Sequence, residues 1–252
     1  MKWMVLVTAA TAALVGCSHS PIEPETPRSD NAAALNVQLG IAYLRQGDLS
    51  IAKEKLEKAV KQNPRDPNAH SALALLYERL GKPAEVDAQY RIALRLAPQN
   101  PDISNNYAIY LCRNGRAEEG VKRFIEAARN PLYRTPEAAY TNAGVCLRNV
   151  KRFEEAEANL KRARQIEPGY AEAAYQLGDL QLDRGRSGDA RAQVDQYLAV
   201  FNATPELLLL GVRSAQALGD RSGAEKYARR LHVEFPGSSQ ERALPDLNRN
   251  SG

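Results

Sequence analysis

The sequence predicts an all-α protein, a solenoid of stacked helix–turn–helix units, and three observations support this prediction. Apolar and small residues recur every 34 residues, so that Leu39, Tyr43 and Gly47 in one copy correspond to Leu73, Tyr77 and Gly81 in the next. Glycines near the middle of most copies suit the left-handed residue that ends a first helix. Prolines at the ends of most copies stop a second helix, because proline cannot continue one. These residues are Gly47, Gly81, Gly115, Gly185 and Gly219, and Pro64, Pro98, Pro168 and Pro236.

The N-terminus predicts export and a lipid anchor. A basic residue precedes an apolar run from Met4 to Val15, which is typical of a secretory signal peptide. The run is shorter than the roughly 20 residues of a membrane-spanning helix. It ends in Leu14-Val15-Gly16-Cys17, which resembles a bacterial lipobox and implies cleavage before Cys17 and acylation of that cysteine. Ser18 follows, where aspartate would indicate inner-membrane retention, and this favours the periplasmic face of the outer membrane. The alternative is an ordinary secretory signal with a chance cysteine.

The domain organisation follows from the repeat. Residues 1–16 are the predicted signal peptide, and residues 17–32, with three prolines and no apolar periodicity, are a predicted flexible tether. The solenoid fills residues 33–238, and residues 239–252 are a polar C-terminal tail. The units are 33–66, 67–100, 101–134, 137–170, 171–204 and 205–238. Two extra residues separate the third and fourth units, and the sixth is degenerate, as is common at the end of a repeat array.

Small side chains at two fixed positions make the pattern more specific. With the first residue of each unit counted as position one, positions eight and twenty are small in almost every unit, which lets neighbouring helices approach closely. Position eight holds Gly40, Ala74, Ala108, Gly144 and Gly178, and position twenty holds Ala52, Val86, Gly120, Ala156, Ala190 and Ala224. The pattern resembles the tetratricopeptide repeat (TPR), and the resemblance implies a right-handed superhelical solenoid of six helix pairs.

The first helices of the first units predict a peptide-binding groove. The concave face is expected at positions two, five, nine, twelve and thirteen, which in the first units supply five apolar side chains, with arginine at position thirteen. Such a groove suits an apolar or amphipathic peptide. The predicted groove residues are Val37, Ile41, Leu44, Leu75 and Ile109, with Arg45 and Arg79 and, in the third unit, Arg113 beside them. The alternative is that a segment around residues 32–35 folds over these side chains.

The last two units differ from the first three on the same face. Their equivalent positions are polar or charged, which predicts a solvated surface rather than a groove. The residues are Glu172, Asp179, Asp183, Glu206 and Arg213.

Two cysteines remain besides Cys17. Cys112 and Cys146 lie on the first helices of neighbouring units, at similar heights along those helices. Because the periplasm is oxidising, this placement favours a disulfide. Closing that loop stabilises the fold by roughly 3–4 kcal/mol on the chain-entropy model. The alternative is a pair of buried free thiols.

Composition and motifs argue against catalysis and nucleic-acid binding. The net charge is only +4, and the lysines and arginines are interspersed with acids instead of following one face. His19, His70 and His232 lack the spacing of metal ligands. No phosphate-binding loop or nucleophile elbow occurs. We therefore expect a non-enzymatic protein with no cofactor, metal or small-molecule substrate.

A narrower resemblance covers the chain from about Leu35 onward, together with the lipobox. The third and fourth units and the C-terminal region are similar to the type IV pilus biogenesis and stability lipoproteins, the PilF/PilW pilotin family. The matching residues are Asn106-Tyr107-Ala108, Leu111-Cys112, Phe124, Ala127, Pro131-Leu132-Tyr133, Asn142-Ala143-Gly144-Val145-Cys146, Leu208-Leu209-Leu210-Gly211-Val212-Arg213 and Phe235-Pro236-Gly237-Ser238.

The resemblance implies a lipid-anchored pilotin. Such a protein binds the type IV pilus secretin and promotes its outer-membrane localisation and multimerisation, which pilus biogenesis and stability require. Its partners are then the secretin and, through acylated Cys17, outer-membrane lipid. The alternative is a general envelope TPR adaptor that scaffolds peptidoglycan hydrolases or outer-membrane assembly factors.

Overall fold

The computed structural model describes residues 27–244, with side chains from residue 31 onward. Cys17, the predicted signal peptide and most of the predicted tether lie outside these residues. Within the described range all regular structure is helical, which confirms the all-α prediction. No helix in this range combines the length and the apolar character needed to cross a bilayer.

The helices follow one another with short connections. Their bounds are α1 (Pro27–Gln46), α2 (Leu49–Gln62), α3 (Pro67–Arg79), α4 (Pro83–Leu96), α5 (Pro101–Arg113), α6 (Ala117–Arg129), α7 (Pro136–Asn149), α8 (Phe153–Ile166), α9 (Ala171–Asp183), α10 (Ser187–Leu198), α11 (Pro205–Ala217), α12 (Arg221–Glu234) and α13 (Ser239–Arg242).

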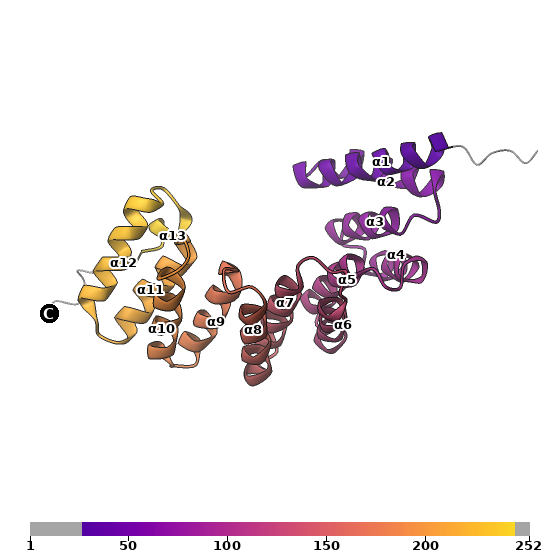
Figure 1. Ribbon diagram of the computed structural model, residues 1–252. Coiled ribbons are helices and arrows are strands. Elements are labelled where there is room, and N and C mark those ends of the chain that lie inside the picture. The colour runs from indigo at the N-terminus through magenta and orange to yellow at the C-terminus, as the bar shows by residue number, and fades with distance from the viewer. Residues whose placement is uncertain (1–26, 245–252) are drawn as a thin grey trace, which may run out of the picture.

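Consecutive helices pack as pairs, and the pairs stack into a curved solenoid (Figure 1). The pair α1–α2 lies at one end of the stack and α11–α12, with the short α13, lies at the other (Figure 1). Each pair packs only against the pairs next to it, as expected for a repeat protein.

The first helix is longer than the repeat alone predicts. α1 begins at Pro27, inside the segment 17–32 that the sequence marks as a tether. Proline is favoured at the first position of a helix, and the alanine-rich residues 32–34 have high helix propensity. Residues 32–35 are therefore part of α1, and they do not fold over the predicted groove as one sequence interpretation allowed.

Close packing within the pairs explains the small residues of the repeat. A Cβ atom added to Gly144 would lie 2.6 Å from Leu160 Cγ and 3.1 Å from the Ala156 carbonyl oxygen. Added to Gly40, it would lie 2.5 Å from Leu56 Cγ. In these two units position eight thus lies where a leucine of the second helix fills the space next to the backbone of the first.

Left-handed residues end the first helices, as the sequence predicts. Gly47, Gly81, Gly115, Gly185 and Gly219 have φ values of 86°, 66°, 77°, 73° and 73°. In the fourth unit the equivalent residue is Lys151, with a φ of 62°, and it is the one non-glycine residue of the described range with positive φ. A side chain in this conformation costs about 1–2 kcal/mol relative to ordinary helical backbone.

Replacing Lys151 with glycine is therefore expected to stabilise the chain by about 1 kcal/mol, because the strain exceeds the extra entropy of an unfolded glycine. Urea denaturation of the two proteins measures this. The matched control is Lys58→Gly inside α2, which should instead destabilise by about 1 kcal/mol. A lower midpoint for Lys151→Gly would contradict the strain argument.

An ion pair with a tyrosine joins the second and third units. Asp87 on α4 accepts a hydrogen bond of 2.6 Å from the Tyr107 hydroxyl and two of 2.8 Å from Arg116 Nη1. Burial acts to raise the pKa of the Asp87 carboxyl, but the bonds from Tyr107 and Arg116 outweigh it and hold that pKa below its ordinary value.

This network makes stability pH-dependent. Because the folded pKa of Asp87 lies below the unfolded pKa of about 3.9, its contribution is present above pH 4 and is lost as pH falls further. Asp87→Asn should cost about 1–2 kcal/mol at pH 7, since charged hydrogen bonds are lost. The difference from the native chain should shrink between pH 4 and pH 2. Urea midpoints measured across that range test this, and a constant difference would refute the assignment.

Candidate functional site

A groove crosses the first helices of the first three pairs, α1, α3 and α5. It has a volume of about 570 Å³ and is lined by Ile41, Leu44, Arg45, Leu75, Glu78, Arg79 and Arg113. The aliphatic side chains come from α1 and α3, and every charged residue lies in the last turn and a half of its helix. The groove therefore combines an apolar surface with a charged rim.

Six of the predicted groove residues line this space, namely Ile41, Leu44, Leu75, Arg45, Arg79 and Arg113. Two do not. Val37 is only 6% exposed and packs in the core with Leu56 and Leu73. Ile109 packs against the core cluster around Phe124. Val37 is therefore covered by neighbouring helices, whereas Ile109 is partly buried and does not line this space.

Glu78 is the lining residue that sequence reasoning missed. It occupies position twelve of the second unit, the position that Leu44 holds in the first, so the repeat register contained the information. Its carboxylate lies 3.5 Å from Arg113 Nη1.

The rim of the groove carries excess positive charge. Arg45 and Arg79 are exposed, and neither forms an ion pair with another described residue. Glu78 is the one acidic residue that lines the groove, and it pairs with Arg113. The groove lining therefore carries three arginines and one carboxylate. An apolar surface with free guanidinium groups suits a segment that carries both apolar side chains and carboxylates.

The apolar character of position nine ends after the fourth unit, where an ion-pair network begins. Position nine runs through Ile41, Leu75, Ile109 and Val145 and then becomes Asp179 and Arg213. Asp179 is only 8% exposed, and its two oxygens each lie 2.8 Å from a guanidinium nitrogen, one of Arg148 and one of Arg213. Arg148 also pairs with Asp183. The prediction of a solvated face is therefore wrong for Asp179, which is a buried ion-pair centre.

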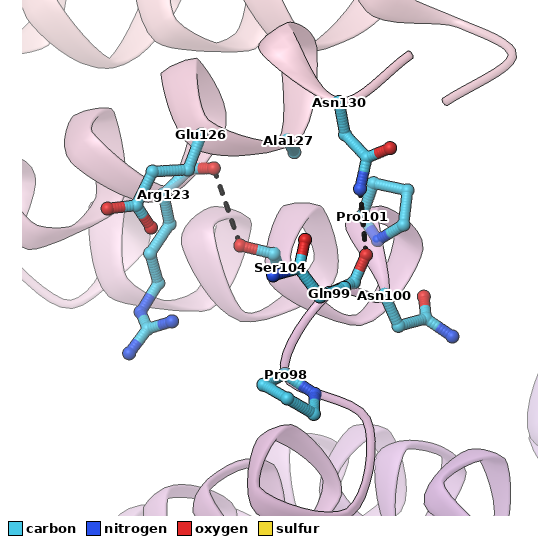
Figure 2. A pocket seen from close by; sticks show the side chains of 9 residues that line it. All are labelled: Pro98, Gln99, Asn100, Pro101, Ser104, Arg123, Glu126, Ala127 and Asn130. Atoms are coloured by element: carbon cyan, nitrogen blue, oxygen red, sulfur yellow. Dashed lines mark hydrogen bonds between the residues drawn. The ribbon is translucent and has the colours of Figure 1, made fainter. Parts of the chain in front are cut away.

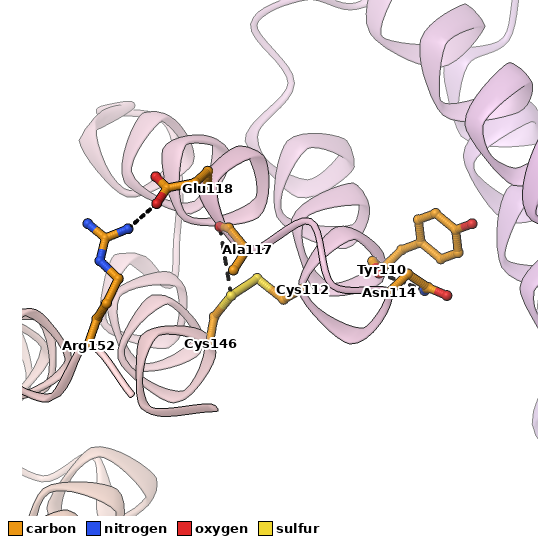
Figure 3. The surroundings of a disulfide bond; sticks show 7 residues. All are labelled: Tyr110, Cys112, Asn114, Ala117, Glu118, Cys146 and Arg152. Atoms are coloured by element: carbon orange, nitrogen blue, oxygen red, sulfur yellow. Dashed lines mark hydrogen bonds and ion pairs between the residues drawn. A yellow bond between two sulfur atoms is a disulfide. The ribbon is translucent and has the colours of Figure 1, made fainter. Parts of the chain in front are cut away.

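A disulfide joins α5, one of the groove helices, to α7 (Figure 3). Cys112 on α5 and Cys146 on α7 are bonded, with their Cα atoms 5.7 Å apart. The bond joins helices on either side of the junction that contains the two extra residues. A Cβ atom added to Gly120 would lie 2.4 Å from Cys112 Sγ. Glycine at position twenty of this unit therefore leaves the space that the sulfur occupies.

A smaller hollow of about 240 Å³ opens between the α4–α5 connection and α6 (Figure 2). Two of its polar side chains bond backbone carbonyl groups. Ser104 Oγ donates to the Arg123 carbonyl at 3.4 Å, and Asn130 Nδ2 donates to the Gln99 carbonyl at 2.8 Å (Figure 2). These bonds hold the connection against α6, and the hollow carries no nucleophile and base in contact.

Metal ligation finds no support in the described part of the chain. No group of three or more His, Cys, Asp or Glu side chains there could hold an ion. The ring nitrogens of His70 bond Gln89 Oε1 at 2.6 Å and the Pro64 carbonyl at 3.0 Å, and His70 therefore ties α3 to its neighbours.

Comparison with known proteins identifies the repeat and its relatives. Tetratricopeptide-repeat family models match residues 37–101 and 149–210. The type IV pilus assembly protein PilF of Pseudomonas aeruginosa is 29% identical over 237 residues, which span 92% of this chain and 94% of that protein.

Solved structures agree with the sequence comparison. The crystal structure of PilW, a widely conserved type IV pilus biogenesis factor, has a TM-score of 0.68 at 31% identity, and the match covers 84% of this chain and 97% of PilW. The structure of Pseudomonas aeruginosa PilF has a TM-score of 0.67 at 29% identity, covering 86% of this chain and 97% of that one. Similarity of this extent includes nearly the whole relative rather than the repeats alone. The chain therefore belongs to the PilF/PilW family of tetratricopeptide-repeat proteins of type IV pilus biogenesis.

Proposed function

We propose that this protein is a lipid-anchored pilotin. It binds the type IV pilus secretin through the groove on α1, α3 and α5 and promotes the secretin's outer-membrane localisation and multimerisation. The groove carries the proposal, because an apolar surface with two free arginines is suited to holding a protein segment and offers no catalytic constellation. Its family membership supplies the pilus context.

The anchor is the second part of the proposal. Residues 1–16 are removed as a signal peptide, Cys17 is acylated, and the residues between Cys17 and α1 connect the lipid to the solenoid. Several acyl chains together hold a protein durably on a leaflet, whereas a single chain binds reversibly. The protein then lies on the periplasmic face of the outer membrane, where the Cys112–Cys146 bond forms after export.

The alternative proposal is a general envelope adaptor for peptidoglycan hydrolases or outer-membrane assembly factors. It would use the same anchor and groove. The near-complete coverage of PilF and PilW favours the pilus proposal over it.

Affinity capture tests the choice between them. The full-length tagged chain is recovered from detergent-solubilised envelopes, and co-purifying proteins are quantified against a strain with an untagged chain. The proposal expects the secretin to be enriched. Enrichment of hydrolases or assembly factors, with secretin at background, would refute it in favour of the adaptor.

A further inference from the structure

The first helix of each unit buries one stripe of side chains against the preceding unit. The stripe consists of positions three, seven and ten. In the second unit these are Ala69, Leu73 and Leu76, with exposures of 0%, 4% and 0%. The later units bury the same positions: Ile103, Tyr107 and Tyr110; Ala139, Ala143 and Cys146; Ala173, Leu177 and Leu180; and Leu207, Gly211 and Ser214.

The preceding second helix is what covers this stripe. Val86, Tyr90 and Ala93 of α4, at spacing i, i+4, i+7, form one core cluster with Ile103, Tyr107 and Tyr110 of α5. The rings of Tyr90 and Tyr107 stack with their centroids 4.8 Å apart. Each junction between units is therefore an amphipathic helix seated on positions three, seven and ten of the next helix.

In the first unit this stripe is exposed. Leu35 is 56% exposed, Leu39 is 37% exposed, and Ala42 is also exposed. α1 is the outermost helix at its end of the stack (Figure 1). We call Leu35, Leu39 and Ala42 the end face. Repeat proteins usually cover such an end with a polar capping element, so an apolar end face is a departure from the rule.

The opposite end of the solenoid follows the rule. Phe235 and Leu244 pack onto the last core cluster, and α13 packs against α11 and α12. Exposed residues of α12 include Lys226 and Arg229. Among residues 27–244, the chain thus covers the C-terminal end of the stack with its own residues and leaves the end face on α1 exposed.

Neither the chain itself nor a second copy is a suitable occupant. Between Cys17 and Pro27 the chain has nine residues, with prolines at 21 and 24, whereas the second helices of the first two pairs each have 14 residues. Counted after the proposed cleavage before Cys17, that segment is shorter than the helices that cover the equivalent stripe in the other units. Two copies meeting α1 to α1 would share only the strip of Leu35, Leu39 and Ala42, whereas a stable interface buries roughly 800 Å² per partner.

We propose that the end face binds an amphipathic α-helix of a partner protein, which stacks on α1 as α4 stacks on α5. The partner helix presents apolar side chains at i, i+4 and i+7, the pattern of Val86, Tyr90 and Ala93. The end face and the groove share α1, so one partner can contact both, and the groove contacts then add to this small one. The inference concerns a face outside the groove and does not require the secretin to be the partner.

A capped chain tests this directly. A copy of residues 49–66, which contain α2 and its following turn, replaces residues 27–32 and so precedes residue 33 in repeat register. The copy should cover the end face, leave the protein monomeric and raise its thermal midpoint by several degrees. In a strain that lacks the native gene, it should fail to restore pilus assembly although it reaches normal levels.

The matched control carries the same insert with lysine at the copies of Ala52, Leu56 and Ala59, which removes the apolar face of the added helix. This control should restore pilus assembly. A second pair of variants avoids insertions altogether. Leu35→Glu with Leu39→Glu should reduce assembly at least tenfold with an unchanged thermal midpoint, whereas Val200→Glu with Val233→Glu, at sites 74% and 71% exposed, should have no effect.

Two results would overturn the proposal. One is full pilus assembly with the capped chain, which would show that the end face has no docking role. The other is a native chain that is dimeric in light scattering and becomes monomeric with Leu35→Glu and Leu39→Glu, which would make a second copy the occupant. If the capped chain fails in pilus assembly yet still captures the secretin normally, the end face binds a different partner, and the proposal stands independently of the pilotin function.

Discussion

Removing the Cys112–Cys146 disulfide is expected to lower the free energy of unfolding by about 3–4 kcal/mol. The bond closes a loop across a sequence separation of 34 residues, and opening it restores that entropy to the unfolded chain. It also joins α5 to α7 across the irregular junction, so the loss should loosen this part of the solenoid first. Urea denaturation of the native chain with and without reductant measures the effect.

The double variant Cys112→Ala with Cys146→Ala provides the control. It should unfold at the midpoint of the reduced native chain, and reductant should not change it. Amide exchange should rise in α5–α7 before it rises in α11–α12. A native chain whose midpoint is insensitive to reductant would contradict the expected stabilisation.

Charge in the groove is expected to abolish partner binding. Ile41→Asp together with Leu75→Asp places two carboxylates on the apolar surface, and each buried aliphatic side chain contributes about 1.5 kcal/mol or more to a contact. The loss of about 3 kcal/mol corresponds to an affinity for the secretin at least a hundredfold lower. Titration of the purified secretin's periplasmic region with the native and variant chains measures it.

Because Ile41 is partly buried, folding must be controlled. Arg45→Glu with Arg79→Glu changes only exposed side chains and should lower affinity at least tenfold without changing the thermal midpoint. Val200→Asp, at a site 74% exposed in the connection between α10 and α11, is the matched control and should bind as the native chain does. Native affinity in the arginine variant would exclude charge recognition in the groove.

The repeat register predicted most of the fold because it encodes local rules. A glycine at position fifteen, a proline after the second helix and a small residue at position eight each act within one unit, and the structure has them where the sequence does. Lysine itself does not favour left-handed backbone, so only the equivalence of Lys151 to five glycines indicates its conformation.

Burial depends on neighbouring units, and here the sequence was less informative. Asp179 was predicted to be exposed to solvent. Its partners Arg148 and Arg213 lie in the units before and after it, so the pattern within one unit does not indicate its burial. Val37 was predicted to line the groove, but in the structure it packs against residues of α3. Conversely, Leu35 and Leu39 follow the pattern of buried residues and are exposed only because no helix precedes α1 in the described chain.

The state of the secretin in cells tests the pilotin account most directly. Membranes from the native strain, a deletion strain and a Cys17→Ala strain are fractionated and probed for heat-resistant secretin multimers. The account predicts that multimers are lost or mislocalised in the deletion strain and that they leave the outer-membrane fraction in the Cys17→Ala strain. Normal multimers in the outer membrane of all three strains would contradict it.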